Sequence, residues 1–216
     1  MTRHTLSLDL SPTEVRRVRW RRSTADLTAL EPLDLPLWVA CAWDLRPPGG
    51  LARQCDQRLD GALSRQVSSG RLGLAFGEVA LVGAGQHLAG SHLLLLGLGA
   101  PGAFEPSQAG ALGRDLADRL HKLGHTRYAL EVPWLSEVSV PGASLVATDF
   151  VAAHVRRRLT LLGPAGALSV TWVLPETVHL ARGRATRPGG RRRASLWPRR
   201  HHRARRVTFF RHRLKK

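Results

Sequence analysis

The hydrophobic positions of this chain follow two periods, one typical of buried strands and one typical of amphipathic helices. Near-continuous or alternating apolar runs predict strands over residues 37–43, 78–82, 91–96, 128–132 and 168–174. Apolar residues three and four positions apart predict helices over residues 51–63, from about 107 to 123, and over 143–161. This order is typical of an α/β protein with a mostly parallel, mixed sheet flanked by helices on both faces.

Three parts of the chain differ in pattern. Residues 1–35 form an N-terminal strand region, and residues 36–180 hold the regular strands and helices of one compact α/β domain. Residues 181–216 lack apolar periodicity and are rich in arginine, so we expect a disordered basic C-terminal tail. The pattern therefore predicts one folded unit that ends near residue 180.

The N-terminal region contains one alternating stretch and one basic stretch. Leu6, Leu8 and Leu10 alternate with polar residues, as in a half-buried strand. The segment from Arg16 to Arg22 is strongly basic and carries one aromatic residue, Trp20. It is either a strand that contacts phosphates or an edge strand whose charges face water. We favour the edge strand, because charged edges are a common protection against aggregation.

The charge of the chain is concentrated at one end. The formal net charge is +17, but residues 1–180 hold 18 Lys and Arg against 16 Asp and Glu. The remaining 15 basic residues lie in residues 181–216, which contain no acid. Polycations bind nucleic acid through phosphate contacts. We therefore predict nonspecific nucleic-acid contacts for the tail, with these candidate residues: Arg191, Arg192, Arg193, Arg199, Arg200, Arg205 and Arg206.

Cysteine content and hydropathy limit the environment of the protein. The two cysteines, Cys41 and Cys55, are too few for a disulfide framework, and each sits in an apolar stretch typical of a buried thiol. The start of the chain lacks the apolar core of a signal peptide. No run approaches the roughly 20 apolar residues of a membrane span. We expect a cytoplasmic protein without a membrane partner.

One glycine motif follows a predicted strand. Gly97-x-Gly99-x-x-Gly102 matches the dinucleotide fingerprint, and we expect it to form a loop. Pro101 interrupts the turn, however, and the nearest acid on the next strand, Glu131, comes too late and in mid-strand. Nucleotide or other ligand binding by Gly97, Gly99 and Gly102 is the weaker interpretation, and a plain strand-to-helix turn is the stronger one.

Catalytic and metal-ligating patterns are weak. The ten histidines are not spaced as metal ligands beside acids. Asp56 and Asp60 are four apart on a predicted helix, but nearby arginines favour a solvated, charge-balanced face. Asp149 is interpreted as a boundary charge of the third helix. We predict no catalytic residue, no metal ligand and no cofactor.

One combination of segments resembles a known family. It comprises a helix from Gly50 to Leu63, then Gly77-Glu78, then an apolar strand that ends in Gly97-Leu98-Gly99. Together these resemble the N-terminal domain of leucyl aminopeptidases, the dinuclear-metal cytosol aminopeptidases, over roughly residues 36–175. The resemblance implies a macro-like α/β fold. It also implies that the two divalent metals belong to a second domain, whose characteristic Asn-Thr-Asp-Ala-Glu-Gly-Arg segment is absent here.

The resemblance gives the main functional hypothesis, and two alternatives stand beside it. The chain is expected to be a stand-alone or truncated aminopeptidase N-terminal domain, inactive alone, with a regulatory or assembly role. Its expected partners are further copies of itself or a separate catalytic domain. The alternatives are a nucleic-acid-binding module that uses the basic tail, and a macro-like binder of ADP-ribose or another nucleotide. The tail is interpreted either as a genuine extension or as the product of a frameshift or truncated gene.

Overall fold

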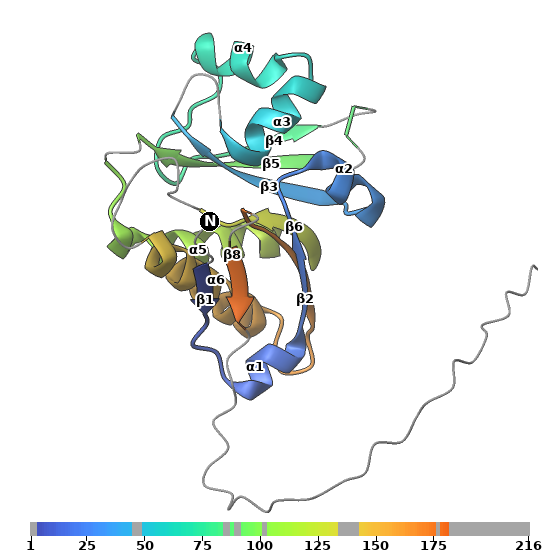
Figure 1. Ribbon diagram of the computed structural model, residues 1–216, viewed down its shortest axis with the longest axis vertical. Coiled ribbons are helices and arrows are strands. Elements are labelled where there is room, and N and C mark those ends of the chain that lie inside the picture. Colours follow the sequence, from blue (N-terminus) through green and yellow to red (C-terminus); the bar gives the residue numbers. More distant parts are fainter. Residues whose placement is uncertain are drawn as a thin grey trace, which may run out of the picture. The chain divides into compact units, whose positions relative to one another are not determined.

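The computed structural model describes residues 4–44, 49–83, 87–88, 92–100, 103–133, 143–175 and 178–181. The basic residues named above for the tail, and Gly102, lie outside the described residues. The described elements form a six-stranded sheet with helices on both faces and a separate two-stranded sheet (Figure 1). The predicted fold class is therefore confirmed.

The six-stranded sheet has the order β2-β7-β6-β3-β5-β4. Its strands are β2 (Val18–Ser23), β3 (Leu37–Trp43), β4 (Val79–Gly83), β5 (His92–Gly99), β6 (Arg127–Glu131) and β7 (Leu168–Val173). All neighbouring strands are parallel except β4, which pairs antiparallel with β5. The remaining strands, β1 (His4–Ser7) and β8 (Val178–Ala181), pair parallel with each other.

Two apolar cores lie on opposite faces of this sheet. One face packs against α5 (Ala109–Lys122) and α6 (Ala143–Leu161), and β1 and β8 join that core through Leu6 and Val178. The other face packs against α2 (Leu27–Leu30), α3 (Gly50–Arg58) and α4 (Ala62–Ser68). Every residue of β3 is buried, because this central strand is covered on both faces. Figure 1 shows α3 and α4 on one side of β3 and β5, with α5 and α6 on the other.

The helix predicted over residues 51–63 is in fact two helices. Asp60 and Gly61 adopt positive φ angles of 52° and 73°, which end α3 and begin α4. The charge-balanced face expected for Asp56 is also wrong, because Asp56 is buried. Its carboxylate accepts hydrogen bonds from the backbone N–H and the hydroxyl of Ser64. Asp56 therefore caps α4, since an acceptor at a helix start satisfies its unpaired N–H groups.

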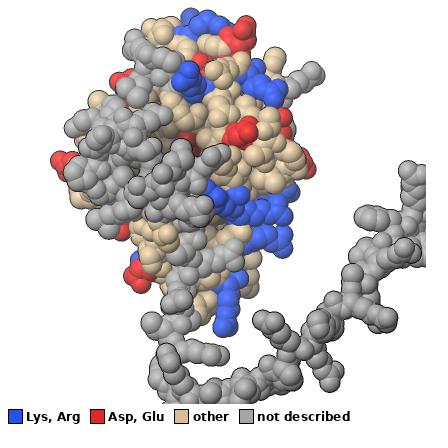
Figure 2. Space-filling model, viewed as in Figure 1, with Lys and Arg blue, Asp and Glu red and all other residues tan. Residues whose placement is uncertain are grey.

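The basic N-terminal stretch is shared between a helix and a strand. Arg16 and Arg17 end α1 (Pro12–Arg17), which starts with a capping box between Ser11 and Glu14. Arg17 donates to the carbonyls of Leu159, Gly163 and Gly166 around the end of α6. The rest of the stretch forms β2 at the sheet edge, as predicted, with Arg19, Arg21 and Arg22 exposed. Figure 2 shows basic side chains gathered on the side of the molecule where β2 lies.

Three shorter elements complete the fold. They are η1 (Glu31–Leu33), η3 (Pro106–Gln108) and β8, none of which the apolar pattern predicts. Glu105 forms a capping box with Gln108 at the start of η3, and α5 follows directly after η3. Gly124 follows the end of α5 with a positive φ of 73°, a conformation that glycine favours after a helix.

Candidate functional site

The strand order places a crevice between β3 and β6. From β3 the chain runs through α3, α4 and β4 to β5 on one side, and then crosses to β6 on the other side of β3. In open parallel sheets, ligands bind at the carboxyl ends of the strands where the direction of winding reverses. The carboxyl ends of β3 and β6 therefore define the candidate site.

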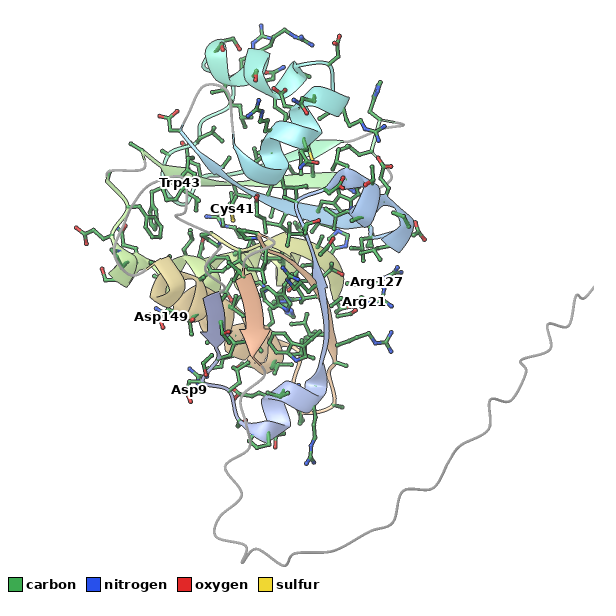
Figure 3. The ribbon with its side chains drawn as sticks, in the orientation of Figure 1. Asp9, Arg21, Cys41, Trp43, Arg127 and Asp149 are labelled. Atoms are coloured by element: carbon green, nitrogen blue, oxygen red, sulfur yellow. The ribbon has the colours of Figure 1, made fainter. Side chains whose placement is uncertain are left out.

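A cavity of about 260 Å³ opens at this position. It is lined by residues from the ends of four parallel strands and from the start of α3: Cys41, Trp43, Gly49, Gly50, Leu98, Glu131, Val132, Pro133, Val173 and Pro175, together with Ala25. Figure 3 labels Cys41 and Trp43, which come from the carboxyl end of β3. Most of the lining is apolar, and Glu131 is the one lining residue with an ionisable carboxylate.

Glu131 lines this cavity and is held by backbone donors from two elements. Its Oε2 accepts from the N–H of Cys41 in β3 at 2.9 Å, and its Oε1 accepts from the N–H of Leu51 in α3 at 2.9 Å. Helix α3 has no side-chain cap from its own N-cap residue, Gly49. A carboxylate from a strand 80 residues later in sequence therefore supplies the negative charge that a helix start favours.

Gly50 is required for this arrangement on two grounds. Its φ of +57° lies in the left-handed region that favours glycine. A Cβ at this position would also collide with Oε1 of Glu131. The glycine therefore lets the helix start approach the carboxylate closely.

The thiol beside Glu131 is not prepared for nucleophilic attack. Cys41 Sγ donates to the backbone carbonyl of Glu131 at 3.1 Å. Burial, with a smaller contribution from the charge of Glu131, raises the pKa of the Cys41 thiol well above its usual value. Burial likewise raises the pKa of Cys55 to about 12. Both thiols stay protonated near neutral pH, and both are buried as predicted.

The predicted glycine loop is a strand with a close backbone neighbour. Gly97 and Gly99 lie within β5, so the expectation of a loop over these residues is wrong. A Cβ on Gly97 would collide with the carbonyl of Ala75, and Gly99 N–H donates to Leu74 O at 2.9 Å. Because Gly97 and Gly99 have no side chains, the backbone before β4 packs directly against β5. Leu98, which lies between the two glycines, lines the cavity. Ligand binding by Gly97 and Gly99 stays a prediction.

Comparisons with known proteins agree with this architecture. The sequence model described as "Cytosol aminopeptidase family, N-terminal domain" matches residues 42–153, more than half of the chain. The chain belongs to this family. No curated protein sequence matches it. A mutant of tomato leucine aminopeptidase is similar at 16% identity and TM-score 0.49, and the match covers 74% of this chain and 34% of the enzyme. The chain thus spans about a third of that enzyme.

Macrodomains are the other similar structures. A Trypanosoma brucei macrodomain in complex with ADP has 18% identity and TM-score 0.57, over 81% of this chain and 73% of that one. The macrodomain of Mycobacterium tuberculosis DarG has 15% identity and TM-score 0.53, over 73% of this chain and 98% of that one. These similarities confirm that the aminopeptidase N-terminal domain has a macro-like fold.

A second polar group of this aminopeptidase domain lies away from the cavity, in the core between β6, α5 and α6. His154 Nδ1 lies 3.1 Å from the carbonyl of Gly113, and its Nε2 lies 2.7 Å from the hydroxyl of Tyr128. Because a carbonyl only accepts, Nδ1 carries the proton and Tyr128 donates to Nε2. Burial lowers the pKa of His154 to about 3. The neutral imidazole therefore joins the three elements as a structural group.

Two further sequence predictions concern metal ligands and membrane spans. Within the residues that the structure describes, no group of three or more His, Cys, Asp or Glu side chains could hold a metal ion. Among the same residues, no helix has the length and apolar character to cross a bilayer. Asp149 is exposed on α6, as expected for a boundary charge.

The sequence pattern points only weakly to Glu131, the most informative residue of the site. It placed Glu131 in mid-strand, but Glu131 is the last residue of β6. The available signal was its position just before Val132-Pro133, since proline ends a strand and the carboxyl end of a parallel strand is where sites form. The partner of this carboxylate, the start of α3, could not be found from local pattern.

Proposed function

We propose that this chain is a non-catalytic accessory domain of a leucyl aminopeptidase-type metallopeptidase, and that it acts through protein contacts in assembly or regulation. Its membership of the aminopeptidase N-terminal family supports this role. The chemistry of the cavity supports it further, because the cavity is arranged differently from a site for an anionic ligand.

The observation that carries the proposal is the position of Glu131. A nucleotide diphosphate that binds at the switch point of an α/β sheet places its phosphates on backbone N–H groups at a helix start. Here the N–H of Leu51 at the start of α3 already donates to the Glu131 carboxylate. A diphosphate would have to displace this carboxylate or approach it against like-charge repulsion. The Glu131 carboxylate thus occupies the position at the start of α3 that the phosphates of an anionic ligand would take.

The shortage of carboxylates in the C-terminal part of the chain argues against hydrolysis by this chain. A two-metal hydrolytic site requires several anionic ligands to hold its cations. No Asp or Glu follows Glu176 in the sequence, so the C-terminal segment supplies none. Asp56 and Glu131 accept hydrogen bonds from backbone N–H groups at the starts of α4 and α3. They serve as helix caps rather than as metal ligands.

A hydrolysis assay tests the proposal. The purified full chain is dialysed against chelator, loaded with Mn²⁺ or Zn²⁺, and incubated with leucine amide and a chromogenic leucine anilide. We expect no turnover above the metal-only blank, and no retained metal after desalting. Metal-dependent turnover that co-elutes with the folded protein, together with two retained metal ions per chain, would refute it.

Binding of ADP-ribose or a related nucleotide is the second candidate function. What favours it is the cavity at the carboxyl ends of β3 and β6, together with the fold shared with macrodomains, one of which is described in complex with ADP-ribose. Glu131 argues against it for the electrostatic reason given above. Calorimetry with ADP-ribose separates the two functions, because only a nucleotide-binding domain gives a saturable heat.

Nucleic-acid binding by the basic tail stays the other alternative. It is supported by the 15 basic residues of residues 181–216 and depends on nothing in the folded part. Phosphate contacts give a strong salt dependence, so binding by the tail alone should weaken steeply between low and physiological salt. Tight, sequence-selective binding at physiological salt would favour this function over an accessory role.

A further inference from the structure

The two edges of the six-stranded sheet are protected very differently. The β2 edge carries three exposed arginines, Arg19, Arg21 and Arg22, which discourage pairing with another strand. The opposite edge is β4, whose sequence Val-Ala-Leu-Val-Gly has no charge and no proline. No Asp, Glu, Lys or Arg occurs anywhere between Glu78 and Glu105. The β4 edge therefore lacks the protection that its counterpart has.

The backbone of β4 presents donors and acceptors on its outer side. Gly97 N–H donates to the carbonyl of Glu78 at 2.8 Å, so the carbonyl of Glu78 points toward β5. The N–H and C=O of one residue point to the same side of a strand, and the side alternates from residue to residue. The backbone groups of Val79, Leu81 and Gly83 therefore point outward, and within the described residues no other strand pairs with them.

The centre of β4 carries an exposed apolar side chain. Leu81 is the middle residue of this five-residue strand and is 50% exposed. Among the large apolar side chains that the structure describes, it is the most exposed, ahead of Phe76 and Leu123 at 41% each. At Leu81, outward-pointing backbone groups and an exposed apolar side chain occur together, so this surface is complementary to a second copy of itself.

We propose that β4 is the edge through which two copies of this chain associate, with antiparallel β4 strands related by a two-fold axis at Leu81. This inference rests on the proposed contact role of the domain, to which it assigns a surface and a partner. Directly opposite residues of an antiparallel pair lie on the same face. Leu81 of one copy therefore meets Leu81 of the other, and each covers the exposed side chain of its counterpart.

Charge decides in favour of a second copy at this edge. In an antiparallel self-paired strand only the residue on the axis meets its own copy, and every other residue faces a different residue of the same strand. A strand rich in one charge therefore brings like charges together, which is destabilising. Self-pairing of β2 would bring its arginines together, whereas β4 brings together only uncharged residues. A five-residue strand is about 17 Å long. This contact is smaller than a standard stable interface, so the dimer is weak and concentration-dependent.

Sedimentation velocity of matched lysine variants tests the proposal. The full chain is treated with nuclease and measured at physiological salt from about 5 to about 500 µM, a range that covers micromolar dissociation constants. Leu81→Lys places a charge at the proposed axis. Ala29→Lys places the same charge at an exposed position of α2, beside the β2 edge. Circular dichroism shows whether each variant is folded.

The expected outcomes separate the proposed edge from every other surface. The wild-type and Ala29→Lys proteins shift from the monomer to the dimer mass as concentration rises, while Leu81→Lys stays monomeric with an unchanged spectrum. The proposal is overturned if wild-type protein is monomeric throughout, or if Leu81→Lys associates as wild type does. Either failure leaves the hydrolysis result unaffected, so the accessory role and the β4 edge are judged separately.

Crosslinking gives a second readout that does not depend on a destabilising charge. Leu81→Cys treated with a short bismaleimide should form a covalent dimer, because the two Cβ atoms of a directly opposed pair lie about 5 Å apart. Ala29→Cys should not. The native Cys41 and Cys55 are buried, so wild-type protein provides the blank. Equal crosslinking of both variants would show random collision and would count against the proposal.

Discussion

The buried histidine should make the stability of this domain depend on pH between about 3 and 6.5. His154 is fully buried, and burial lowers its pKa from the ordinary value of about 6.5 to about 3. Below pH 6.5 the unfolded chain takes up a proton at this residue while the folded chain does not. The stability that the neutral His154 contributes is therefore fully present above pH 6.5 and is lost as pH falls toward 3.

The magnitude follows from this shift. Each pH unit between the two pKa values costs about 1.4 kcal/mol for one proton. From pH 7 to pH 5, His154 alone should lower the free energy of unfolding by about 2 kcal/mol. Other groups also titrate over this range, so the contribution of His154 has to be isolated by substitution.

Urea unfolding at pH 7 and pH 5, followed by tryptophan fluorescence, measures this contribution. His154→Gln keeps an acceptor for the Tyr128 hydroxyl but cannot gain a proton, so its stability should fall by about 2 kcal/mol less than that of wild type between the two pH values. Tyr128→Phe removes the hydroxyl and keeps the buried imidazole, so it should retain the wild-type pH dependence. Parallel pH profiles for wild type and His154→Gln would show that the buried imidazole does not set this pH dependence.

Three further substitutions test the contacts that shape the domain, each by urea unfolding at neutral pH. Glu131→Ala removes two hydrogen bonds from backbone N–H groups to a carboxylate, and should destabilise by about 3 kcal/mol; a loss below 1 kcal/mol would mean that the helix start does not depend on it. Gly113→Ala drives a Cβ into the carbonyl of Phe150 where α5 meets α6, and should cost about 2 kcal/mol or more; unchanged stability would contradict this close packing. Asp56→Ala should cost about 1–2 kcal/mol as a lost helix cap, whereas Asp149→Ala, which alters an exposed side chain, should change stability by less than about 0.5 kcal/mol.

The central strands and the long helices could be predicted because their signals are local. Strand β3 is a continuous apolar run, and the predicted helix over residues 143–161 has the bounds of α6. The capping box of Ser11 and Glu14 was also present in the sequence, and using it would have separated α1 from β2. These features depend on neighbours within one or two turns of the chain.

The features that escaped prediction depend on tertiary structure. The break at Asp60 and Gly61 requires two successive positive φ angles, which the apolar stripe through Leu59 and Leu63 conceals. The glycines of β5 are needed because a distant backbone segment approaches them, although their spacing imitates a nucleotide-binding loop. The contact of Glu131 with the start of α3 joins residues 80 apart, and no periodicity encodes it.

In the proposed function, the carboxylate of Glu131 holds the position where an anionic ligand would bind, and the domain acts through protein contacts. Calorimetric titration of ADP-ribose into the full chain tests it most directly. We expect only heats of dilution up to millimolar ligand. A saturable isotherm with one site per chain would contradict it, above all if Glu131→Ala changed the affinity.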